Sequence, residues 1–432
     1  MRLQLATFPV RDLTFSDSTR LSDGILHIDR QKVTELVLED SRFDGVELHI
    51  VKPGESVRMV NVLDAVEPRY KVSGPGTVFP GLLGPPVTVG EGRTHRLSNV
   101  AVIETSEPVE GAEPANWRDS VMDISGPGGE HNMFANTLNL VLEFKPRNKF
   151  SPEEMPQLEL TNYNRGSLWV QQYHKSVRTA GAKVAAYLAE VTKDMTPADI
   201  QAYELAPPDP SLPNVAYSCQ ILYHLVYGEP VGWQPTLVHP NEFMDGFLVN
   251  PHTPPAAHRD AMYVHQNHPL IEDLYRRQGR EFNFVGVLLY AAQIKTLEDK
   301  ERSTGYAAKL LRMMGVDGLV MTWTGSGNPG MDIMMLCQKC EQLGIKTSMI
   351  NVEMSMTQGD PGFVYFVPEA DRIVSAGNYE QSIDLPAPDK VIGGTKIRAP
   401  EMDATGAVPL TLRYLFGSTN VLGGGKLGGV SY

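Results

Sequence analysis

Histidine is concentrated in one short segment of this chain. The sequence holds 11 histidines in 432 residues, so the segment between residues 239 and 268 would hold fewer than one if they were evenly spread. Five lie there: His239, His252, His258, His265 and His268. Neutral imidazole binds zinc, iron, nickel and copper, and a catalytic metal site combines three protein ligands with one open position. The enrichment predicts a divalent transition-metal ion, zinc or iron, with His239, His252, His258 and His268 as its candidate ligands.

The spacing of these histidines does not by itself define a ligand set. His265 and His268 could share one face of a helix, whereas the others are 6 to 13 positions apart and need the fold to bring them together. Asp245 and Asp260 are candidate carboxylate ligands, or partners that orient the imidazoles. The alternative interpretation is a set of histidines scattered on a polar loop, or lining a pocket that binds an acid.

A glycine-rich loop matches the dinucleotide-binding pattern G-x-G-x-x-G in outline. It spans residues 325–330, follows an expected strand, opens an expected helix and has Glu353 beyond it. Pro329 stands at a variable position of the pattern, where proline suits only the first turn of a helix. We therefore expect no NAD at this loop. Its backbone N–H groups could instead meet a carboxylate at the helix N-terminus.

The cysteines predict neither disulfides nor redox chemistry. Three cysteines in 432 residues do not make a disulfide framework. Cys337 and Cys340 have C-x-x-C spacing but fall inside an expected helix, where a thiolate gains little from the helix dipole. Cys219 lies in an apolar strand. We expect Cys337 to pack in the core and Cys219 to be buried and inert.

Composition limits the partners. The 38 basic and 51 acidic residues give a net charge of −13, which argues against nucleic acid or an anionic membrane surface as a partner. No run of 18 apolar residues is present to span a membrane. The first residues lack the apolar core of a signal peptide. The expectation is a cytoplasmic protein that acts on a small molecule.

The chain divides by pattern into three parts, and the expected fold class is α/β. Residues 1–150 form a β-rich N-terminal domain, residues 151–213 a helical segment and a proline-rich linker, and residues 214–432 an α/β domain. In this last part strands alternate with helices, which indicates a Rossmann-like half with a mostly parallel sheet. The expected helices are 174–191, 297–314 and 331–343, the expected strands are 215–227, 282–290, 317–323 and 346–353, and the expected linker is 194–213.

A set of short motifs, in a fixed order, resembles the glycine/sarcosine/betaine reductase component B precursor family, which is related to the D-proline reductase proprotein. Each motif is short, but the ordered set is specific. The segments are Glu67-Pro-Arg69, Gly74-Pro-Gly76, Phe79-Pro-Gly81, Val89 to His95, Asp123 to Gly128, Phe243-Met-Asp-Gly246, Tyr263-Val-His-Gln-Asn267, Asn283 to Val287, Lys300 to Ser303, Gly327-Asn-Pro329 and Gly344 to Thr347.

The resemblance implies a particular chemistry. Precursors of this family are cleaved at a cysteine between the Met-Asp-Gly and Tyr-Val-His-Gln-Asn motifs, and the new N-terminus becomes a pyruvoyl group that captures the substrate amine. A selenocysteine or cysteine on a partner subunit then breaks the C–N bond. Thr253 stands here where the family has its cysteine, and two prolines follow it. Elimination from threonine would leave a 2-oxobutyryl group, so the sequence favours an uncleaved chain without pyruvoyl.

These observations lead to one expected function and two alternatives. We expect a component-B-type subunit that acts on a small amine or amino-acid-like substrate, as a homo-oligomer or in a complex with a second, reductase-type subunit. The alternatives are a self-sufficient metal-dependent lyase or hydrolase and a non-catalytic binding subunit. The candidate catalytic residues are His265, which the family retains, and Thr253, and the candidate substrate-binding residues are Asp245, Gln266, Asn267 and Asn328.

Overall fold

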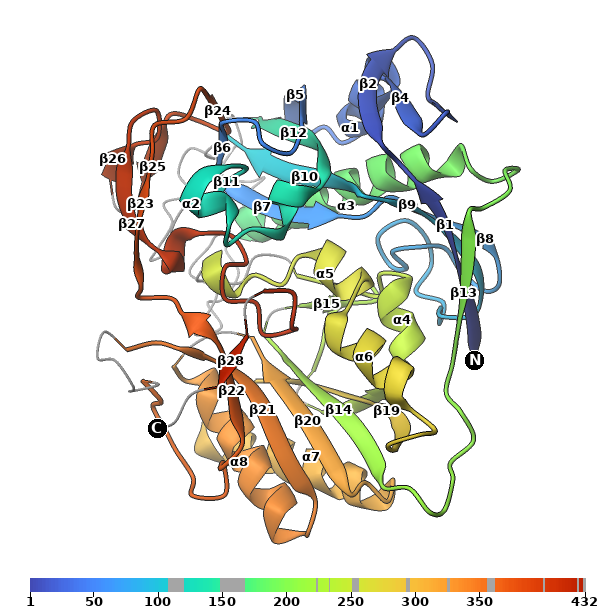
Figure 1. Ribbon diagram of the computed structural model, residues 1–432, viewed down its shortest axis with the longest axis vertical. Helices are drawn as coiled ribbons and strands as arrows, with labels where there is room; N and C mark the ends of the chain where they lie inside the picture. The colour runs from blue at the N-terminus through green and yellow to red at the C-terminus, as the bar shows by residue number, and fades with distance from the viewer. Residues whose placement is uncertain are drawn as a thin grey trace.

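The computed structural model of the chain is a mixed α/β structure with several mixed sheets (Figure 1). The residues that it describes contain eight α-helices. The described residues are 1–107, 120–147, 168–222, 224–232, 234–250, 256–292, 296–324, 327–355, 362–398, 401–425 and 427–429.

Two four-stranded sheets form the β-rich part built mainly from the first 150 residues. One has the order β13-β1-β9-β8 and the other the order β5-β12-β10-β7. Two smaller sheets have the orders β2-β4-β3 and β11-β6-β24. Their strands are β2 (Asp12–Ser16), β3 (Arg20–Ser22), β4 (Ile25–Asp29), β6 (Val57–Val60), β11 (Val121–Asp123) and β24 (Lys390–Ile392). The strands of the two larger sheets are β1 (Arg2–Pro9), β5 (Phe43–Val51), β7 (Val62–Val66), β8 (Arg69–Ser73), β9 (Gly92–Ser98), β10 (Val100–Ser106), β12 (Leu138–Pro146) and β13 (Asp199–Glu204).

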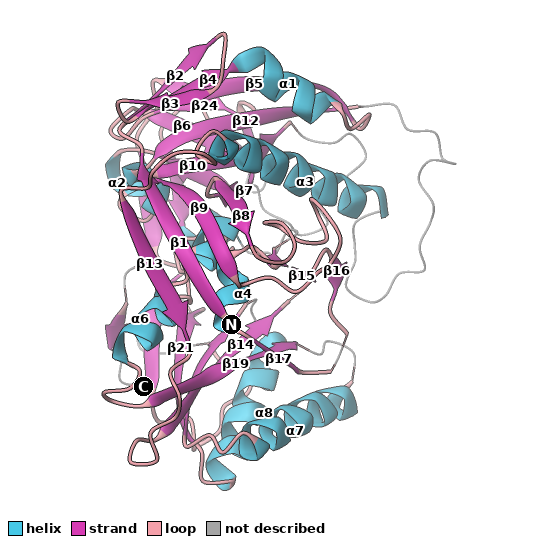
Figure 2. Ribbon diagram, turned by 90° about the vertical axis from the view of Figure 1, so that its right-hand side faces the viewer, coloured by secondary structure: helices cyan, strands magenta, loops and turns pink. Residues whose placement is uncertain are grey.

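The long helix α3 (Leu168–Glu190) packs across these strands (Figure 2). Val177, Val184 and Leu188 recur at helical spacing and are fully buried in the same core cluster as the strand residues Val102 and Phe144. The helix expected at 174–191 is therefore confirmed, and it starts earlier than the pattern indicated.

The second half centres on a seven-stranded sheet of order β17-β19-β14-β20-β21-β22-β28. Its five inner strands run parallel, and the two outermost are antiparallel to their neighbours. The helices α7 and α8 contact each other and lie together against this sheet in the lower part of Figure 1. The elements are β14 (Asn214–Ile221), β17 (Thr236–Val238), β19 (Asn283–Ala291), α7 (Leu297–Met313), β20 (Gly318–Trp323), α8 (Pro329–Gln342), β21 (Lys346–Glu353), β22 (Ile373–Asn378) and β28 (Gly428–Gly429).

The expected strands and helices of this half are confirmed to within two residues, from β19 to β21. The first strand of the half, β14, lies between β19 and β20. Its carboxyl end connects toward β19 on one side, whereas the neighbouring β20 connects to β21 on the other side. In open α/β sheets such a point is where ligands bind. The Rossmann-like classification itself stays a prediction.

Two expectations need correction. The segment expected as a linker at 194–213 contains the strand β13, which pairs antiparallel with β1 almost 200 residues earlier in the chain. The single strand expected at 215–227 is two, β14 and the short β15 (Leu225–Val226). In the first case the missing information is a partner strand that lies far away in the sequence. In the second, β15 pairs outside the seven-stranded sheet, with the short strands β16 (Glu229–Pro230) and β18 (Leu248–Val249).

The C-terminal segment returns to the β-rich part. The strand β24 (Lys390–Ile392) pairs with β6 (Val57–Val60), and buried Arg58 donates to the carbonyl oxygens of Pro386 and Ala404. The three-part division of the chain stays a prediction. None of the described helices is long and apolar enough to cross a membrane.

Candidate functional site

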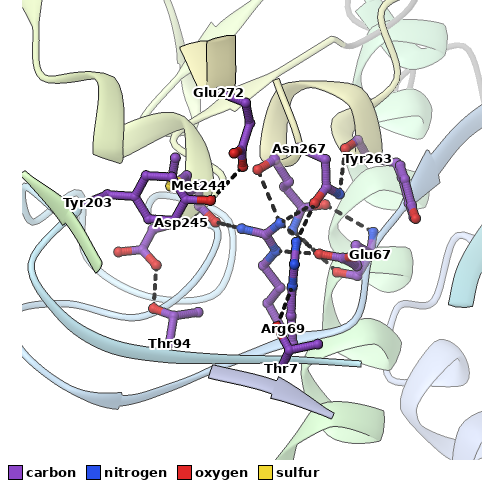
Figure 3. Close-up of polar contacts among 12 residues, drawn as sticks. Thr7, Glu67, Arg69, Thr94, Tyr203, Met244, Asp245, Tyr263, Asn267 and Glu272 are labelled. Carbon is purple, nitrogen blue, oxygen red and sulfur yellow. Dashed lines mark hydrogen bonds and ion pairs between the residues drawn. The ribbon is translucent and has the colours of Figure 1, made fainter. Parts of the chain in front are cut away.

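The motifs that are far apart in the sequence meet around one buried arginine, Arg69 (Figure 3). Its guanidinium pairs with the Glu67 carboxylate at 2.7 Å and donates to the carbonyl oxygen of Met244 at 2.6 Å. It also donates to the carbonyl oxygen of Gln266 at 3.1 Å and to Oδ1 of Asn267 at 2.8 Å. One side chain therefore ties the Glu-Pro-Arg, Met-Asp-Gly and Tyr-Val-His-Gln-Asn motifs together.

Asp245, a predicted substrate-binding residue, is fully buried and occupied by the protein itself. Its carboxylate pairs with Lys71 and accepts hydrogen bonds from the backbone of Gly90 at 2.8 Å and from Oγ1 of Thr94 at 2.5 Å. The next residue, Gly246, has φ +77°, and a Cβ there would lie 2.5 Å from the ring of Phe79. Close packing of two motifs therefore explains the glycine. That Asp245 binds substrate stays a prediction.

Gln266 and Asn267, also predicted to bind substrate, hold the short helix α5 (Met262–Gln266) in place. The Gln266 amide accepts from Glu67 N at 2.9 Å and donates to Glu67 O at 3.2 Å, while Asn267 Oδ1 accepts from Arg69 and Arg96. At the other end, Asp64 accepts from the backbone of Met262 at 2.9 Å. A five-residue helix has little stability of its own, so these contacts fix it and thereby its His265. Substrate binding by Gln266 and Asn267 stays a prediction.

His265 is 1% exposed, and among the described residues neither of its ring nitrogens has a hydrogen-bond partner. Its ring lies edge-on to that of His224, with centroids 5.6 Å apart, and 6.2 Å from that of His268. Burial lowers the pKa of His265 well below its usual value, and the neighbouring His224 and His268 lower it further. His265 is therefore a neutral, buried imidazole whose polar atoms meet no protein partner within the described part of the chain.

His224 is a member of this group that the sequence did not single out, because it lies outside the 239–268 segment. It follows β14, at the carboxyl end of the parallel sheet. Its Nδ1 lies 3.0 Å from the carbonyl oxygen of Leu222, and its Nε2 is buried with no hydrogen-bond partner among the described residues. Burial lowers the pKa of His224 to about 4, so its ring is neutral.

Asp260 completes the group and is fully buried. Its carboxylate accepts from Oγ1 of Thr324 at 2.7 Å and from Nδ2 of Asn420 at 3.2 Å, both neutral donors. Burial raises the pKa of Asp260 to about 7; the Thr324 hydrogen bond opposes this shift, and the charge of Asp64 adds to it. One ligand atom each from His224, Asp260 and His265 can be chosen so that all lie within 4.8 Å of one another.

Three other predicted metal ligands are described by the structure and are not members of this group. His268 is buried beside His265, and its Nε2 lies 3.1 Å from the hydroxyl of Tyr217. The two residues do not share one helix: His265 lies in α5, and His268 is the N-cap of the next helix, α6 (Pro269–Arg277). His239 caps α4 (Pro240–Met244) by accepting from the backbone of Asn241 at 3.2 Å. His258 is buried against the ring of Tyr379. Ligand roles for these residues stay predictions.

Three further predicted residues are His252, Thr253 and Asn328. His252 and Thr253 fall outside the described residues, so their roles stay predictions. Before them, the carbonyl oxygen of Asn250 accepts from Nε of the buried Arg178 at 3.1 Å. Asn328 is half-buried at the start of α8, where its carbonyl oxygen accepts from Lys300 Nζ at 3.2 Å. Its role in substrate binding also stays a prediction.

A cavity of about 570 Å³ lies next to the histidine group. Its lining includes most of residues 124–136, which begin inside the Asp123 to Gly128 motif, together with Ala261, Val264 and Asn420. Asn420 also donates to Asp260, so the cavity and the buried group share a wall. The lining carries both signs of charge, on Glu130 and Arg259. This volume is typical of a small-molecule site.

Comparison with known proteins agrees with this convergence of motifs. The sequence profile of the glycine/sarcosine/betaine reductase component B subunits matches residues 1–426. The chain belongs to this family. It is 32% identical over 455 aligned positions to the glycine reductase complex component B subunits alpha and beta of Acetoanaerobium sticklandii, with all of both chains covered. It is 34% identical over 407 positions to the sarcosine reductase complex component B subunit alpha of Peptoclostridium acidaminophilum, covering 91% of this chain and 89% of that one.

A betaine reductase complex component B subunit alpha of Peptoclostridium acidaminophilum is 32% identical, with 91% of this chain and 88% of that one covered. No solved structure matches the chain. The predicted resemblance is therefore confirmed for the family as a whole. In this component B family member, the motifs that carry the resemblance hold α5 in place and line the cavity.

Proposed function

We propose that this chain is the substrate-binding and catalytic subunit of a component-B-type reductase that acts on a small amine or amino-acid-like molecule. The observation that carries the proposal is the family match over residues 1–426, joined to a cavity whose wall contains a family motif. Reductive cleavage of a C–N bond takes up two electrons and two protons, leaving a C–H bond on the carbon and releasing the amine.

The electrons would come from a selenol or thiol of a second subunit, because the chain's own thiols are unsuited to supply them. Its three cysteines are Cys219, Cys337 and Cys340, all buried in the core of the second half. Burial raises the pKa of Cys219 and Cys340 to about 12 and that of Cys337 to about 11, which disfavours the reactive thiolate. In the sequence none of the three cysteines is near position 253, so we propose that the chain works without a cysteine-derived pyruvoyl group. We propose that it assembles with such a subunit, or with itself.

The charges of the cavity support an amino-acid-like substrate. Arg259 can meet a carboxylate and Glu130 an ammonium group, and both line the same space. Arg259 is 3% exposed and held by a hydrogen bond to the carbonyl oxygen of Val62 at 2.5 Å, so its position is fixed before substrate binds.

Calorimetric titration of the purified chain with glycine, sarcosine and betaine tests the binding step. Replacing Glu130 by Gln should weaken binding of an amine about 10-fold or more, since a hydrogen bond to a charged group contributes about 1.5–3 kcal/mol. Exposed Glu401, which does not line the cavity, provides the matched control as Glu401→Gln. Equal affinity of Glu130→Gln and the unchanged chain for every ligand that binds would contradict the assignment of this cavity.

Turnover is tested with the complex purified from the native host and a thiol reductant, by measuring release of the amine. A self-sufficient metal-dependent lyase or hydrolase is a second candidate, favoured by the buried group of His224, Asp260 and His265. It predicts product formation by the chain alone, without reductant. Binding without turnover under either condition would point to a non-catalytic binding subunit.

A further inference from the structure

The geometry points to a divalent transition-metal site formed by His224, Asp260 and His265. This set differs from the ligands that the sequence suggested, because it draws in a histidine from outside the 239–268 segment. The inference stands whichever reaction the chain supports, since it rests on the three side chains alone.

Each of the two imidazoles has a buried ring nitrogen without a hydrogen-bond partner among the described residues. His224 Nδ1 lies 3.0 Å from the carbonyl oxygen and 3.2 Å from the backbone nitrogen of Leu222. In the tautomer that donates to the carbonyl oxygen, the lone pair is on the buried Nε2. Histidine ligands of metals characteristically use their second nitrogen in this way. His265 has two buried ring nitrogens without a hydrogen-bond partner in the described ranges. Buried polar atoms are nearly always satisfied, and an ion would satisfy one of these.

Asp260 supplies the negative charge. Its two carboxylate contacts, to Thr324 and Asn420, come from neutral donors, and no ion pair with Asp260 occurs among the described residues. A buried carboxylate needs a positive charge nearby or takes up a proton. A divalent cation beside Asp260 supplies that charge, and the two hydrogen bonds would orient the carboxylate toward it.

The distances are compatible with a common ion after a small closure. The three ligand atoms lie within 4.8 Å of one another. Ligand atoms about 2.1 Å from one tetrahedral ion are about 3.4 Å apart, so the side chains must draw together by roughly 1 Å. His224 follows β14, whereas Asp260 and His265 lie five residues apart, just before and within α5.

The ligand chemistry selects the class of ion. Two neutral imidazoles and one carboxylate leave positions open for substrate or water, as in catalytic zinc sites and in ferrous sites with two histidines and one carboxylate. Calcium and magnesium prefer oxygen ligands throughout. A second group, Glu47, His49 and Glu143, is partly exposed, and its side chains already pair with Lys145, Lys390 and one another, so we assign no ion there.

The full chain, purified without an affinity tag or chelator, should contain about one zinc or iron ion per chain by elemental analysis. After metal removal, added Co²⁺ should give the visible absorption of a site with nitrogen and oxygen ligands, and added Zn²⁺ should raise the melting temperature. Asp260→Asn keeps the shape of the side chain and should weaken Co²⁺ binding at least 10-fold. His265→Ala and His224→Ala should do the same.

The matched control is His258→Ala, since His258 is a buried histidine outside the group. It should bind Co²⁺ as the unchanged chain does. Loss of the ion in His258→Ala but not in Asp260→Asn would overturn the assignment in favour of the ligands that the sequence suggested. Less than one tenth of an ion per chain, together with no spectral change on adding Co²⁺, would overturn it altogether. Because Asp260→Asn is read by spectroscopy and by its melting temperature without metal, a folding defect is distinguishable from loss of the site.

Discussion

Replacing Arg69 by methionine should destabilise the fold far more than any exposed ion pair could. The Arg69 and Glu67 side chains are 0% and 2% exposed, so the substitution leaves a buried carboxylate without its counter-charge. Removing one partner of a buried pair costs about 3–5 kcal/mol of unfolding free energy. The carbonyl oxygens of Met244 and Gln266 lose a donor at the same time. We therefore expect Arg69→Met to lower the free energy of unfolding by about 4 kcal/mol or more.

The free energy of unfolding is measured by urea denaturation, monitored by near-ultraviolet circular dichroism. The comparison requires that its dependence on urea concentration be the same in both proteins. The matched control is Arg277→Met, which removes the same group from an exposed pair with Glu281, where side chains are 45% and 51% exposed. An exposed pair contributes about 0–1 kcal/mol. If Arg69→Met costs no more than Arg277→Met, the buried network does not stabilise the fold and the reasoning is refuted.

A double variant separates charge from hydrogen bonding. Adding Glu67→Gln to Arg69→Met removes the carboxylate that the first change strands, so the double variant should lose less than the sum of the two single variants. Coupling between contacting residues is about 0.5–3 kcal/mol, and a buried pair should fall at the upper end. Strict additivity would place the cost of Arg69→Met in the lost neutral hydrogen bonds, and not in the stranded charge.

Four further outcomes are expected. Intact-mass measurement should find one polypeptide of 47.6 kDa, because His252-Thr253-Pro254 replaces the family's cleavage cysteine and its surroundings; two fragments meeting near residue 252 would contradict this. Gly181→Ala, in α3, should lower the unfolding free energy by about 1–3 kcal/mol, because its Cβ would collide with the Glu104 carboxylate. Gly305→Ala, in α7 with no atom within 4 Å, should raise it by about 0.5–1 kcal/mol, and the same denaturation assay compares the two. A thiol reagent should label none of the three buried cysteines in the native protein and all three after denaturation; rapid labelling of the folded chain would show that they are accessible.

The sequence by itself determined the elements whose pattern is local. The helices α7 and α8 and the strands β19, β20 and β21 follow from apolar spacing within each segment, because a helix or strand buries a face defined by its own residues. The burial of Cys219 and Cys337 was predicted in the same way. The ordered motifs indicated the family without any knowledge of where they meet.

Only the tertiary structure decided which side chains meet. The strand β13 was missed because its partner β1 lies almost 200 residues away, and Asp245, Gln266 and Asn267 turned out to be held by Lys71, Glu67 and Arg69. His224 joins His265 because the carboxyl end of β14 lies beside α5, a contact that no local pattern records. A count of histidines identifies a segment that is rich in imidazole, but the distances between ligand atoms decide which side chains can bind one ion. Distances between remote segments are fixed by long-range packing, so the sequence suggested the chemistry and the fold selected the residues.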